Sequence, residues 1–451
     1  MNLIEESLKY TTDTKDCVIA AGALVRTPEM FKKLFPGEKA IVVADTNTWR
    51  VAGEAVQRVL EAAGVATEKP FVFTDPELFA EWSYVMQLEA ALKAVNAIPV
   101  AVGSGVINDL CKLVSHRLGR RYMVMGTAAS MDGYTAANAS ITKDGMKQTM
   151  TCKAPLGCIV DSKIAAEAPK EMVASGYADL IAKIPVGADW LLADAIGSES
   201  IHEQGWRFVQ EPLRDSLSQP EKCAAGDVAE TEKLCAGLVM SGFAMQAMDS
   251  SRPASGTEHQ VSHYLDMEGL CYNGKHVSHG FKVGLGTLIS TKTLEFILRQ
   301  DLANLDVDAA VAKWWPSFDA VKATFPQVYG TRTAHITRAE MEFAKKCPTP
   351  AELKRELETL KAKWPELAPK IKAQLMPFEE VRAKLVAVGA PVEPEQIGIT
   401  RARFRETYRG VPYMRARYFG LDLVERLGLL DAHLDELFGQ GGVWAVDRPA
   451  L

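Results

Sequence analysis

Four of the eight histidines of this 451-residue chain lie between positions 259 and 279. In the segment "GTEHQVSHYLDMEGLCYNGKHVSHG" (256–280), His259 and His263 are four residues apart, which places both on one face of a helix. Upstream, "SGYADLIAK" carries Asp179 and Lys183 with the same spacing. Two neutral imidazoles and one carboxylate suit a catalytic Zn²⁺ with an open coordination position. The alternative is that each of these residues has only a structural role, as a hydrogen-bonded histidine of the core or as a helix cap.

A glycine-containing turn forms the second candidate for chemistry. In "VAVGSGVINDLCK", Gly103 and Gly105 follow an apolar run, and Asp109 and Lys112 lie on the helix expected after it. Glycine lets a backbone approach a pyrophosphate, and the start of a helix offers free N–H groups to it. The segment departs from the G-x-G-x-x-G pattern because position 108 is Asn. A purely structural turn therefore remains the alternative.

Two further polar segments follow apolar runs. Asp45 closes "AIVVAD", where a carboxylate either accepts the ribose hydroxyls of NAD or caps the helix expected near Thr48. The loop "MGTAASMDGYTAANAS" carries Thr127, Ser130 and Asp132 after "RYMVM". Three such loops at one edge of a sheet favour a bound dinucleotide.

The elements that must position these residues change character near residue 160. Six apolar runs, separated by amphipathic stretches, predict a doubly wound, Rossmann-like parallel sheet covered on both faces. From Asp161 onward the periodicity is helical. We expect an α/β nucleotide-binding domain over residues 1–160 and an all-α domain for metal and substrate over 161–451. Within the latter, 351–375 is expected to be a helix pair split at Trp364-Pro365, and 415–439 a helical segment ending at Gly439. The six runs are "CVIAAG", "AIVVADT", "KPFVFTD", "AIPVAVGSG", "RYMVMGT" and "GCIVDS".

Composition narrows the class of protein. Hydrophobic residues make up 47% of the chain, charged residues 24%, and the net charge is −6, which is typical of a globular protein and not of a disordered one. No basic stripe indicates nucleic acid or anionic lipid, and no apolar run is long enough to cross a membrane. The N-terminus lacks the apolar core of a signal peptide, and eight scattered cysteines without a C-x-x-C pair indicate reduced thiols. We expect a cytoplasmic enzyme with a small-molecule substrate that forms a homo-oligomer.

Taken together, the loops and the histidine segments resemble the dehydroquinate synthase-like superfamily. This group includes glycerol dehydrogenases, iron-containing alcohol dehydrogenases and sn-glycerol-1-phosphate dehydrogenases, and the resemblance is closest to the last of these. It implies a Rossmann-like domain followed by a helical one. The segments that carry it, in order, are "VVADTNTW", "VGSGVINDLCK", "GTAASMDGYTA", "GYADLIAK", "ADWLLA", "EHQVSH", "HGFKVGLG" and, more weakly, "RARYFGLDLVERLGLL".

The resemblance also implies the roles of single residues. One divalent metal, Zn²⁺ with Ni²⁺ or Fe²⁺ as alternatives, would be held by Asp179, His259 and His279. His279 is preferred to His276 because the metal histidine of the last segment precedes Gly. Asp132 and His263 would act on the substrate, with Asp179 beside them. The residues implied for NAD(H) or NADP(H) are Asp45, Gly103, Gly105, Val106, Ile107, Asn108, Asp109, Thr127, Ala128, Ala129 and Ser130.

The expected reaction is the NAD(P)H-dependent reduction of dihydroxyacetone phosphate to sn-glycerol 1-phosphate, and its reverse. The metal would polarise the substrate oxygen, and His263 would provide a proton route to solvent. Asp45 favours NAD(H), or dual use, because it would repel a 2′-phosphate. Lys183 and Lys282 are candidate phosphate contacts, with surface lysines as the alternative for each.

Three alternative functions remain at this point. A glycerol or polyol dehydrogenase would use an unphosphorylated substrate, and a degenerate nucleotide-binding module would have no activity. A dehydroquinate-synthase-type cyclase typically has Glu where this chain has Asp179, which argues against it. Many iron-containing alcohol dehydrogenases have a third His where Lys183 stands. Ala136 replaces a serine that is common in relatives, and the helical sequence around 340–390 is additional.

Overall fold

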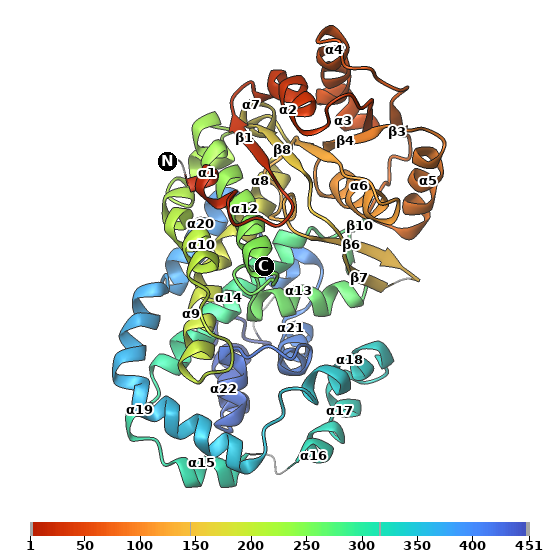
Figure 1. Ribbon diagram of the computed structural model, residues 1–451. Coiled ribbons are helices and arrows are strands. Elements are labelled where there is room, and N and C mark those ends of the chain that lie inside the picture. The colour runs from red at the N-terminus through yellow and green to blue at the C-terminus, as the bar shows by residue number, and fades with distance from the viewer. Residues whose placement is uncertain (1–2, 145, 315–316, 448–451) are drawn as a thin grey trace. The chain divides into compact units, whose positions relative to one another are not determined.

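The computed structural model describes residues 3–144, 146–314 and 317–447 (Figure 1). These residues form two compact units. The first contains the described part of Met1–Leu180 together with Glu203–Ala254 and Ala387–Ala390. The second contains Ile181–His202, Ser255–Val386 and the described part of Pro391–Leu451. Each compact unit therefore combines segments that are far apart in the sequence.

A six-stranded parallel sheet forms the centre of the first unit, in the order β1-β8-β5-β4-β2-β3. All six apolar runs of the sequence are strands of this sheet, so the predicted Rossmann-like architecture is confirmed. The order places β4 and β5 in the middle, where both faces must be covered. The strands are β1 (Asp16–Ala20), β2 (Ala40–Asp45), β3 (Phe71–Phe73), β4 (Ile98–Gly103), β5 (Met123–Gly126) and β8 (Gly157–Asp161).

Side-chain alternation along the strands explains how the sheet is covered. On one face, Val42 and Val100 pack with Phe31 of α2 (Thr27–Leu34) and Leu60 of α4 (Glu54–Ala62). The intervening residues, such as Ala101, are equally buried on the opposite face, and α6 (Gly105–Arg117) packs against β4. Burial on both faces accounts for the nearly continuous apolar character of the strands.

The first unit also contains an antiparallel hairpin that the sequence did not predict. Strands β6 (Asn138–Lys143) and β7 (Met146–Thr151) pair with each other and not with the main sheet. Their side chains are mostly polar and half-buried. The remaining helices of this unit are α1 (Leu3–Ser7), η1 (Ala23–Arg26), α3 (Thr46–Thr48), η2 (Trp49–Gly53), α5 (Trp82–Lys93), α7 (Ser162–Ala166), α8 (Lys170–Ile181, of which Ile181 is assigned to the second unit), α10 (Glu203–Ser216), α11 (Pro220–Ala224) and α12 (Val228–Met248).

The second unit is helical apart from a two-residue hairpin, β9 (Cys271–Tyr272) with β10 (Lys275–His276). Helix α13 (Thr257–Met267) and helix α14 (His279–Leu298) flank this hairpin and pack against each other. The other helices are α9 (Lys183–Ala195), η3 (Leu302–Asn304), α15 (Val307–Lys313), α16 (Phe318–Lys322), α17 (Phe325–Tyr329), α18 (Thr333–Phe343), α19 (Pro350–Gln374), α20 (Phe378–Val388, whose last two residues are assigned to the first unit), η4 (Pro394–Ile397), α21 (Arg401–Gly410), η5 (Val411–Tyr413), α22 (Gly420–Arg426) and α23 (Leu430–Phe438).

Two expectations about helices are corrected, and a third, the helical segment that ends at Gly439, is confirmed in the form of two helices. Residues 350–374 form one helix and not a pair, because a capping box at Thr349 starts it and a buried stripe holds it together through Pro365 and Pro369. Asp179 and Lys183 lie on different helices, since α8 ends at Ile181. The segment 415–439 contains two helices, α22 and α23. The buried stripe of α19 is Leu353, Leu357, Leu360, Trp364, Leu367 and Ile371.

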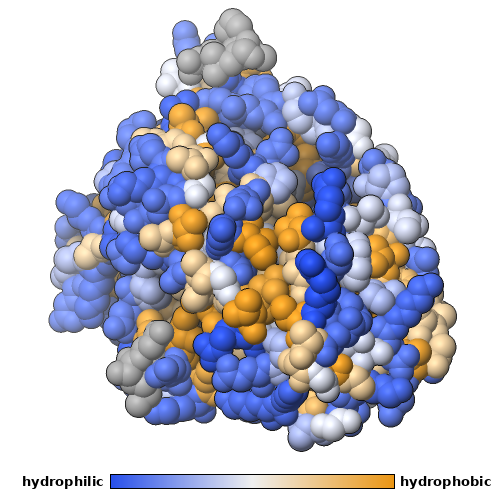
Figure 2. All heavy atoms as spheres, turned by 90° about the horizontal axis from the view of Figure 1, so that it is seen from above, coloured by the Kyte–Doolittle hydropathy of each residue, from blue (hydrophilic) through white to orange (hydrophobic). Residues whose placement is uncertain are grey.

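The surface seen from above is mainly hydrophilic, with a group of hydrophobic side chains near its middle (Figure 2). Among the residues that the structure describes, no helix combines the length and the apolar character needed to cross a lipid bilayer.

Candidate functional site

The turn from β4 to α6 needs only one of its two glycines for packing. A Cβ at Gly103 would lie 2.8 Å from the Cβ of Ile107, so a larger residue there would collide with the first turn of α6. At Gly105 the nearest atom to such a Cβ is Met131 Cγ at 3.4 Å, an ordinary contact. Packing therefore explains why residue 103 is glycine, whereas packing does not require glycine at position 105.

The polar residues that follow on α6 contact neighbouring backbone. Asn108 is buried, and its Nδ2 donates to the carbonyl of Gly133 at 3.2 Å. Asp109 Oδ2 accepts from the backbone N–H of Ser140 at 3.0 Å, and burial raises the pKa of the Asp109 carboxyl. Lys112 Nζ also donates to the Gly133 carbonyl, at 2.7 Å. These side chains fix the loop after β5 and the start of β6.

The loop after β5 lies tightly against its surroundings. The backbone N–H of Thr127 donates to the Gly103 carbonyl at 3.1 Å, which joins the two strand ends. The hydroxyl of Tyr134 donates to the Ala128 carbonyl at 2.9 Å. A Cβ at Gly176 of α8 would lie 2.0 Å from the carbonyl oxygen of Ala129, so this helix requires glycine there. The loop is thus held from α6, from its own chain and from α8.

Asp132 and Asp179 come together within the first unit. The backbone N–H of Asp132 donates to Asp179 Oδ2 at 3.0 Å. One turn earlier on α8, the Ser175 hydroxyl donates to the Ser130 carbonyl at 3.1 Å. Asp179 is fully buried, and this bond orients its carboxylate. Two candidate residues that are 47 positions apart therefore share one hydrogen bond.

Asp45 serves as a helix cap. Its Oδ1 accepts from the backbone N–H groups of Asn47 and Thr48 at 2.8 and 2.9 Å, and the Thr48 hydroxyl accepts from the Asp45 backbone N–H. This is a capping box, so the capping alternative of the sequence holds. Both bonds end on Oδ1, which leaves Oδ2 for another role.

The histidine pair belongs to the second unit. His259 of α13 and His279 at the start of α14 have ring centroids 5.3 Å apart, with the ring planes at 58°. His259 Nδ1 lies 2.7 Å from Glu258 Oε1, and His279 Nδ1 lies 3.3 Å from the hydroxyl of Ser262. Each ring uses Nδ1 for a neighbour on α13. Glu258 is a residue that the sequence did not single out, because adjacent helical positions ordinarily point in different directions.

The other two histidines have different surroundings. His263 lies one turn after His259 on α13, as predicted from their spacing, and is half-buried. Burial lowers the pKa of His263 well below its usual range, while Asp266 partly opposes this shift and Arg415 adds to it. His276 is exposed on β10, where its Nδ1 lies 3.4 Å from Cys271 Sγ.

The two candidate lysines are not surface residues. Lys183 is fully buried at the start of α9, and Lys282 is 3% exposed. Lys282 Nζ forms an ion pair with Asp266 Oδ1 at 2.7 Å and donates to the Val277 carbonyl at 2.6 Å. The alternative that both lysines extend over the surface is therefore wrong. A phosphate at Lys282 would share its ammonium with Asp266.

The available donors fit a divalent metal. Asp179, His259 and His279 offer one carboxylate oxygen and two imidazole nitrogens. In both histidines the Nδ1 atom faces a hydrogen-bonding neighbour, so a bond to a metal would use Nε2. Nitrogen with oxygen donors suits Zn²⁺, Ni²⁺ or Fe²⁺ better than Mg²⁺ or Ca²⁺.

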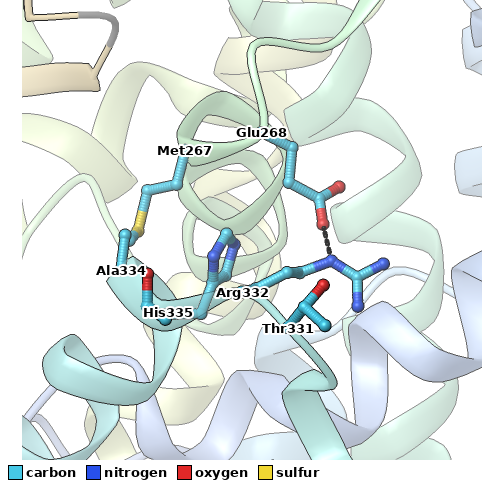
Figure 3. Close-up of a pocket in the computed structure, with 7 residues that line it drawn as sticks. Met267, Glu268, Thr331, Arg332, Ala334 and His335 are labelled. Carbon is cyan, nitrogen blue, oxygen red and sulfur yellow. Dashed lines mark ion pairs between the residues drawn. The ribbon is translucent and has the colours of Figure 1, made fainter.

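A separate hollow of about 480 Å³ lies where α13 ends and α18 begins (Figure 3). Met267 and Glu268 form one wall, and Arg332 and His335 the other. Arg332 Nε pairs with Glu268 at 2.6 Å, and His335 Nε2 donates to the Tyr264 carbonyl at 3.1 Å. None of the residues predicted from the sequence lines this hollow.

Comparison with known proteins identifies the family. A model of iron-containing alcohol dehydrogenases matches residues 18–169. A glycerol-1-phosphate dehydrogenase (NAD(P)+) of Bacillus velezensis is 31% identical over 271 residues, which cover 59% of this chain and 68% of that relative. The protein of the same name from Bacillus licheniformis is 32% identical over 284 residues, 62% of this chain and 70% of that relative. The chain belongs to the glycerol-1-phosphate dehydrogenase family.

Solved structures agree with this family at the level of the fold. The crystal structure of glycerol dehydrogenase from Schizosaccharomyces pombe matches with a TM-score of 0.60 at 14% identity, covering 98% of this chain and 95% of that chain. This family membership confirms the resemblance drawn from the spaced segments. The parallel sheet and the helical second unit are thus the fold expected for the family.

Proposed function

We propose that this protein is a metal-dependent, NAD(P)-linked oxidoreductase that reduces dihydroxyacetone phosphate to sn-glycerol 1-phosphate and catalyses the reverse reaction. The pair formed by His259 and His279 carries this proposal, because two imidazoles with Nδ1 already engaged are prepared to bind a metal through Nε2. Relatives named glycerol-1-phosphate dehydrogenase (NAD(P)+) support the substrate and the cofactor. The unphosphorylated-polyol and cyclase alternatives gain no comparable support.

The strand-end loops of the first unit would bind the cofactor. Helix α6 begins at Gly105, and the first-turn N–H groups of Gly105, Val106 and Ile107 would bind the pyrophosphate. The absence of a side chain at Gly105 would let the pyrophosphate approach them. Asp45 Oδ2 would accept the ribose hydroxyls while Oδ1 caps its helix. The remaining contacts would come from the loop 127–130. Asn108 and Asp109 would support this site by holding the adjoining backbone.

Asp179, His259 and His279 would hold the metal. When bound, a divalent ion supplies Lewis-acid polarisation of a substrate oxygen. Asp132 would contact the substrate from the loop that its own backbone ties to Asp179. Burial lowers the pKa of His263, so its imidazole is neutral near pH 7, and its role in a proton route to solvent stays a prediction.

Three broader features belong to this proposal. Residues 1–160 would supply the cofactor contacts, and residues 161–451 the metal and most substrate contacts. A cytoplasmic location agrees with the eight free cysteines. A homo-oligomeric state stays a prediction.

The decisive experiment is a substrate panel on protein of measured metal content. Dihydroxyacetone phosphate and dihydroxyacetone are each compared with NADH and NADPH. We expect the phosphorylated ketone to be preferred and activity to disappear after chelation and return with Zn²⁺, Ni²⁺ or Fe²⁺. Equal use of the plain ketone would replace this proposal with a glycerol dehydrogenase.

The phosphate contacts need their own comparison. Lys183→Met and Lys282→Met are measured on both ketones. Loss of a charge-assisted phosphate contact costs about 1.5–3 kcal/mol, at least tenfold in kcat/KM, and only with the phosphorylated ketone. Equal loss with both ketones would instead indicate that the lysine supports the fold.

A further inference from the structure

Helix α13 begins with a buried carboxylate directly before the histidine implicated in metal binding. Glu258 is fully buried, and its Oε1 lies 2.7 Å from His259 Nδ1. The same oxygen accepts from the backbone N–H of Gly256 at 2.6 Å. We propose that Glu258 is a positioning residue that holds His259 in one tautomer and one orientation for the metal. This inference rests on the proposed metal site.

The hydrogen-bond directions determine the tautomer. The backbone N–H of Gly256 can only donate, so Glu258 Oε1 acts as an acceptor. His259 Nδ1 then carries the proton that it shares with this oxygen. In a neutral imidazole the lone pair must therefore reside on Nε2. Glu258 thus leaves His259 with Nε2 as its single metal-binding nitrogen.

The position of Glu258 is fixed by its neighbours in the second unit. Asp189 Oδ2 accepts from the backbone N–H and the hydroxyl of Thr257, at 3.1 and 2.9 Å. Asp189 Oδ1 accepts from the backbone N–H of Gly420 at 2.7 Å. The first turn of α13 is therefore tied to α9 and to the start of α22, and the Glu258 carboxylate cannot turn away without breaking buried bonds.

A carboxylate behind a metal-binding histidine has two chemical effects. It restrains the ring, so that less rotational freedom is lost when a metal binds, and it makes the imidazole more basic. Losing such a partner typically lowers metal affinity about 10- to 100-fold. Glu258 should therefore influence metal retention although it does not contact the metal.

The first test measures Zn²⁺ binding to chelator-treated protein by titration calorimetry with a competing chelator. Glu258→Ala should bind about 100-fold more weakly and Glu258→Gln about tenfold, because the amide keeps an acceptor oxygen but loses the charge. Glu268→Gln is the matched control: Glu268 lies at the opposite end of α13, forms ion pairs with Arg332 and Arg403, and the variant should bind Zn²⁺ as the wild type does. Wild-type affinity in a folded Glu258→Ala protein would overturn the proposal.

The second test reads the tautomer directly. Two-dimensional ¹H–¹⁵N spectra of metal-free, ¹⁵N-histidine-labelled protein should show His259 with Nδ1 protonated, assigned by its loss in His259→Ala. In Glu258→Ala, which removes the acceptor, the Nε2-protonated form should appear, and in Glu258→Gln, which keeps an acceptor oxygen but loses the charge, it should appear in part. An unchanged tautomer would contradict the role of Glu258. Because this spectrum needs neither metal nor substrate, it separates failure of this inference from failure of the proposed function. Glu258→Gln preserves the side-chain shape, so it also covers the case in which Glu258→Ala does not fold.

Discussion

Gly286 of α14 lies against the backbone of Glu258 on α13. A Cβ at Gly286 would be 2.4 Å from the Glu258 carbonyl oxygen and 2.8 Å from its Cα. Two helices can approach this closely only where one of them has no side chain. The same approach brings His279, near the start of α14, beside His259. The distance between the rings of His259 and His279 therefore depends on the absence of a side chain at Gly286.

Gly286→Ala should therefore separate α13 from α14. Because the added methyl meets backbone and not a flexible side chain, we expect a loss of about 1–3 kcal/mol in the free energy of unfolding. Metal affinity should fall as well, since the histidines move apart. Urea unfolding and Zn²⁺ titration check both effects. Gly105→Ala, in which the added Cβ would have Met131 Cγ as its nearest neighbour at 3.4 Å, serves as the control for both measurements.

The two glycines of the β4–α6 turn should respond in opposite ways. Gly103→Ala would collide with Ile107 and lower the melting temperature. Gly105→Ala meets only Met131 at an ordinary distance, so stability should hold while the KM for NADH rises. Thermal melts and steady-state kinetics on both variants distinguish the roles. An unchanged KM in Gly105→Ala would place the pyrophosphate elsewhere.

Asp45 combines a structural and a proposed binding role that substitution can separate. Asp45→Asn keeps a capping side chain, whereas Asp45→Ala loses the cap at a cost of about 1 kcal/mol. Both remove the charge that would repel a 2′-phosphate. We expect the ratio of kcat/KM for NADH over NADPH to fall in both variants, and stability to fall only in Asp45→Ala. A strong preference of the wild type for NADPH would argue against the ribose contact.

Alanine substitutions of the histidines should differ in their effects on activity and bound metal, according to where each histidine lies. His259→Ala and His279→Ala should each abolish activity and lower the bound metal measured by mass spectrometry. His276→Ala should do neither, because His276 is exposed on the β9–β10 hairpin. Metal loss in His276→Ala with retention in His279→Ala would reverse the assignment.

Stability should depend on pH through Glu425. Burial raises the pKa of Glu425 to about 7, from 4.5, although the hydroxyl of Tyr413 donates to its Oε1 at 2.7 Å. Between these values the folded protein binds a proton that the unfolded chain has lost, so the free energy of unfolding falls as pH rises from about 4.5 to about 7. Glu425→Gln removes this contribution. Urea unfolding at pH 5 and pH 8 should show a smaller difference in the variant, and an identical difference would contradict the shift.

Much of the fold could be predicted from hydrophobic pattern alone. The six strands of the main sheet are buried on both faces, so each is an uninterrupted apolar run. The β6–β7 hairpin escaped prediction because its residues are polar and half-buried. Helix α19 was divided in error at Trp364-Pro365, since tertiary packing of its apolar stripe outweighs the local cost of proline.

Residues of the candidate site could be predicted where their spacing along the sequence was informative. They could not be predicted where their role depends on tertiary packing. The separation of His259 from His263 indicated a helix, and the family resemblance selected His279 because it precedes Gly280. Glu258 gave no such signal, because its contact with His259 arises from a side chain that folds back toward Gly256. The burial of Lys282 depends on Asp266, which no pattern in the sequence associates with it.

The return of residues 203–254 to the first unit has a consequence for biosynthesis. Gln246 on α12 accepts from the backbone N–H groups of Asp13 and Thr14, at 3.0 and 3.2 Å, and donates to the Thr135 carbonyl at 2.6 Å. The contacts of Asp13 and Thr14 with Gln246 can therefore form only after the ribosome has added more than two hundred residues. Until then the nascent sheet lacks α12 and exposes apolar surface, so this segment should depend on chaperones during translation. A chain released at residue 180 should accumulate in inclusion bodies, whereas one that extends beyond residue 254 should retain its sheet.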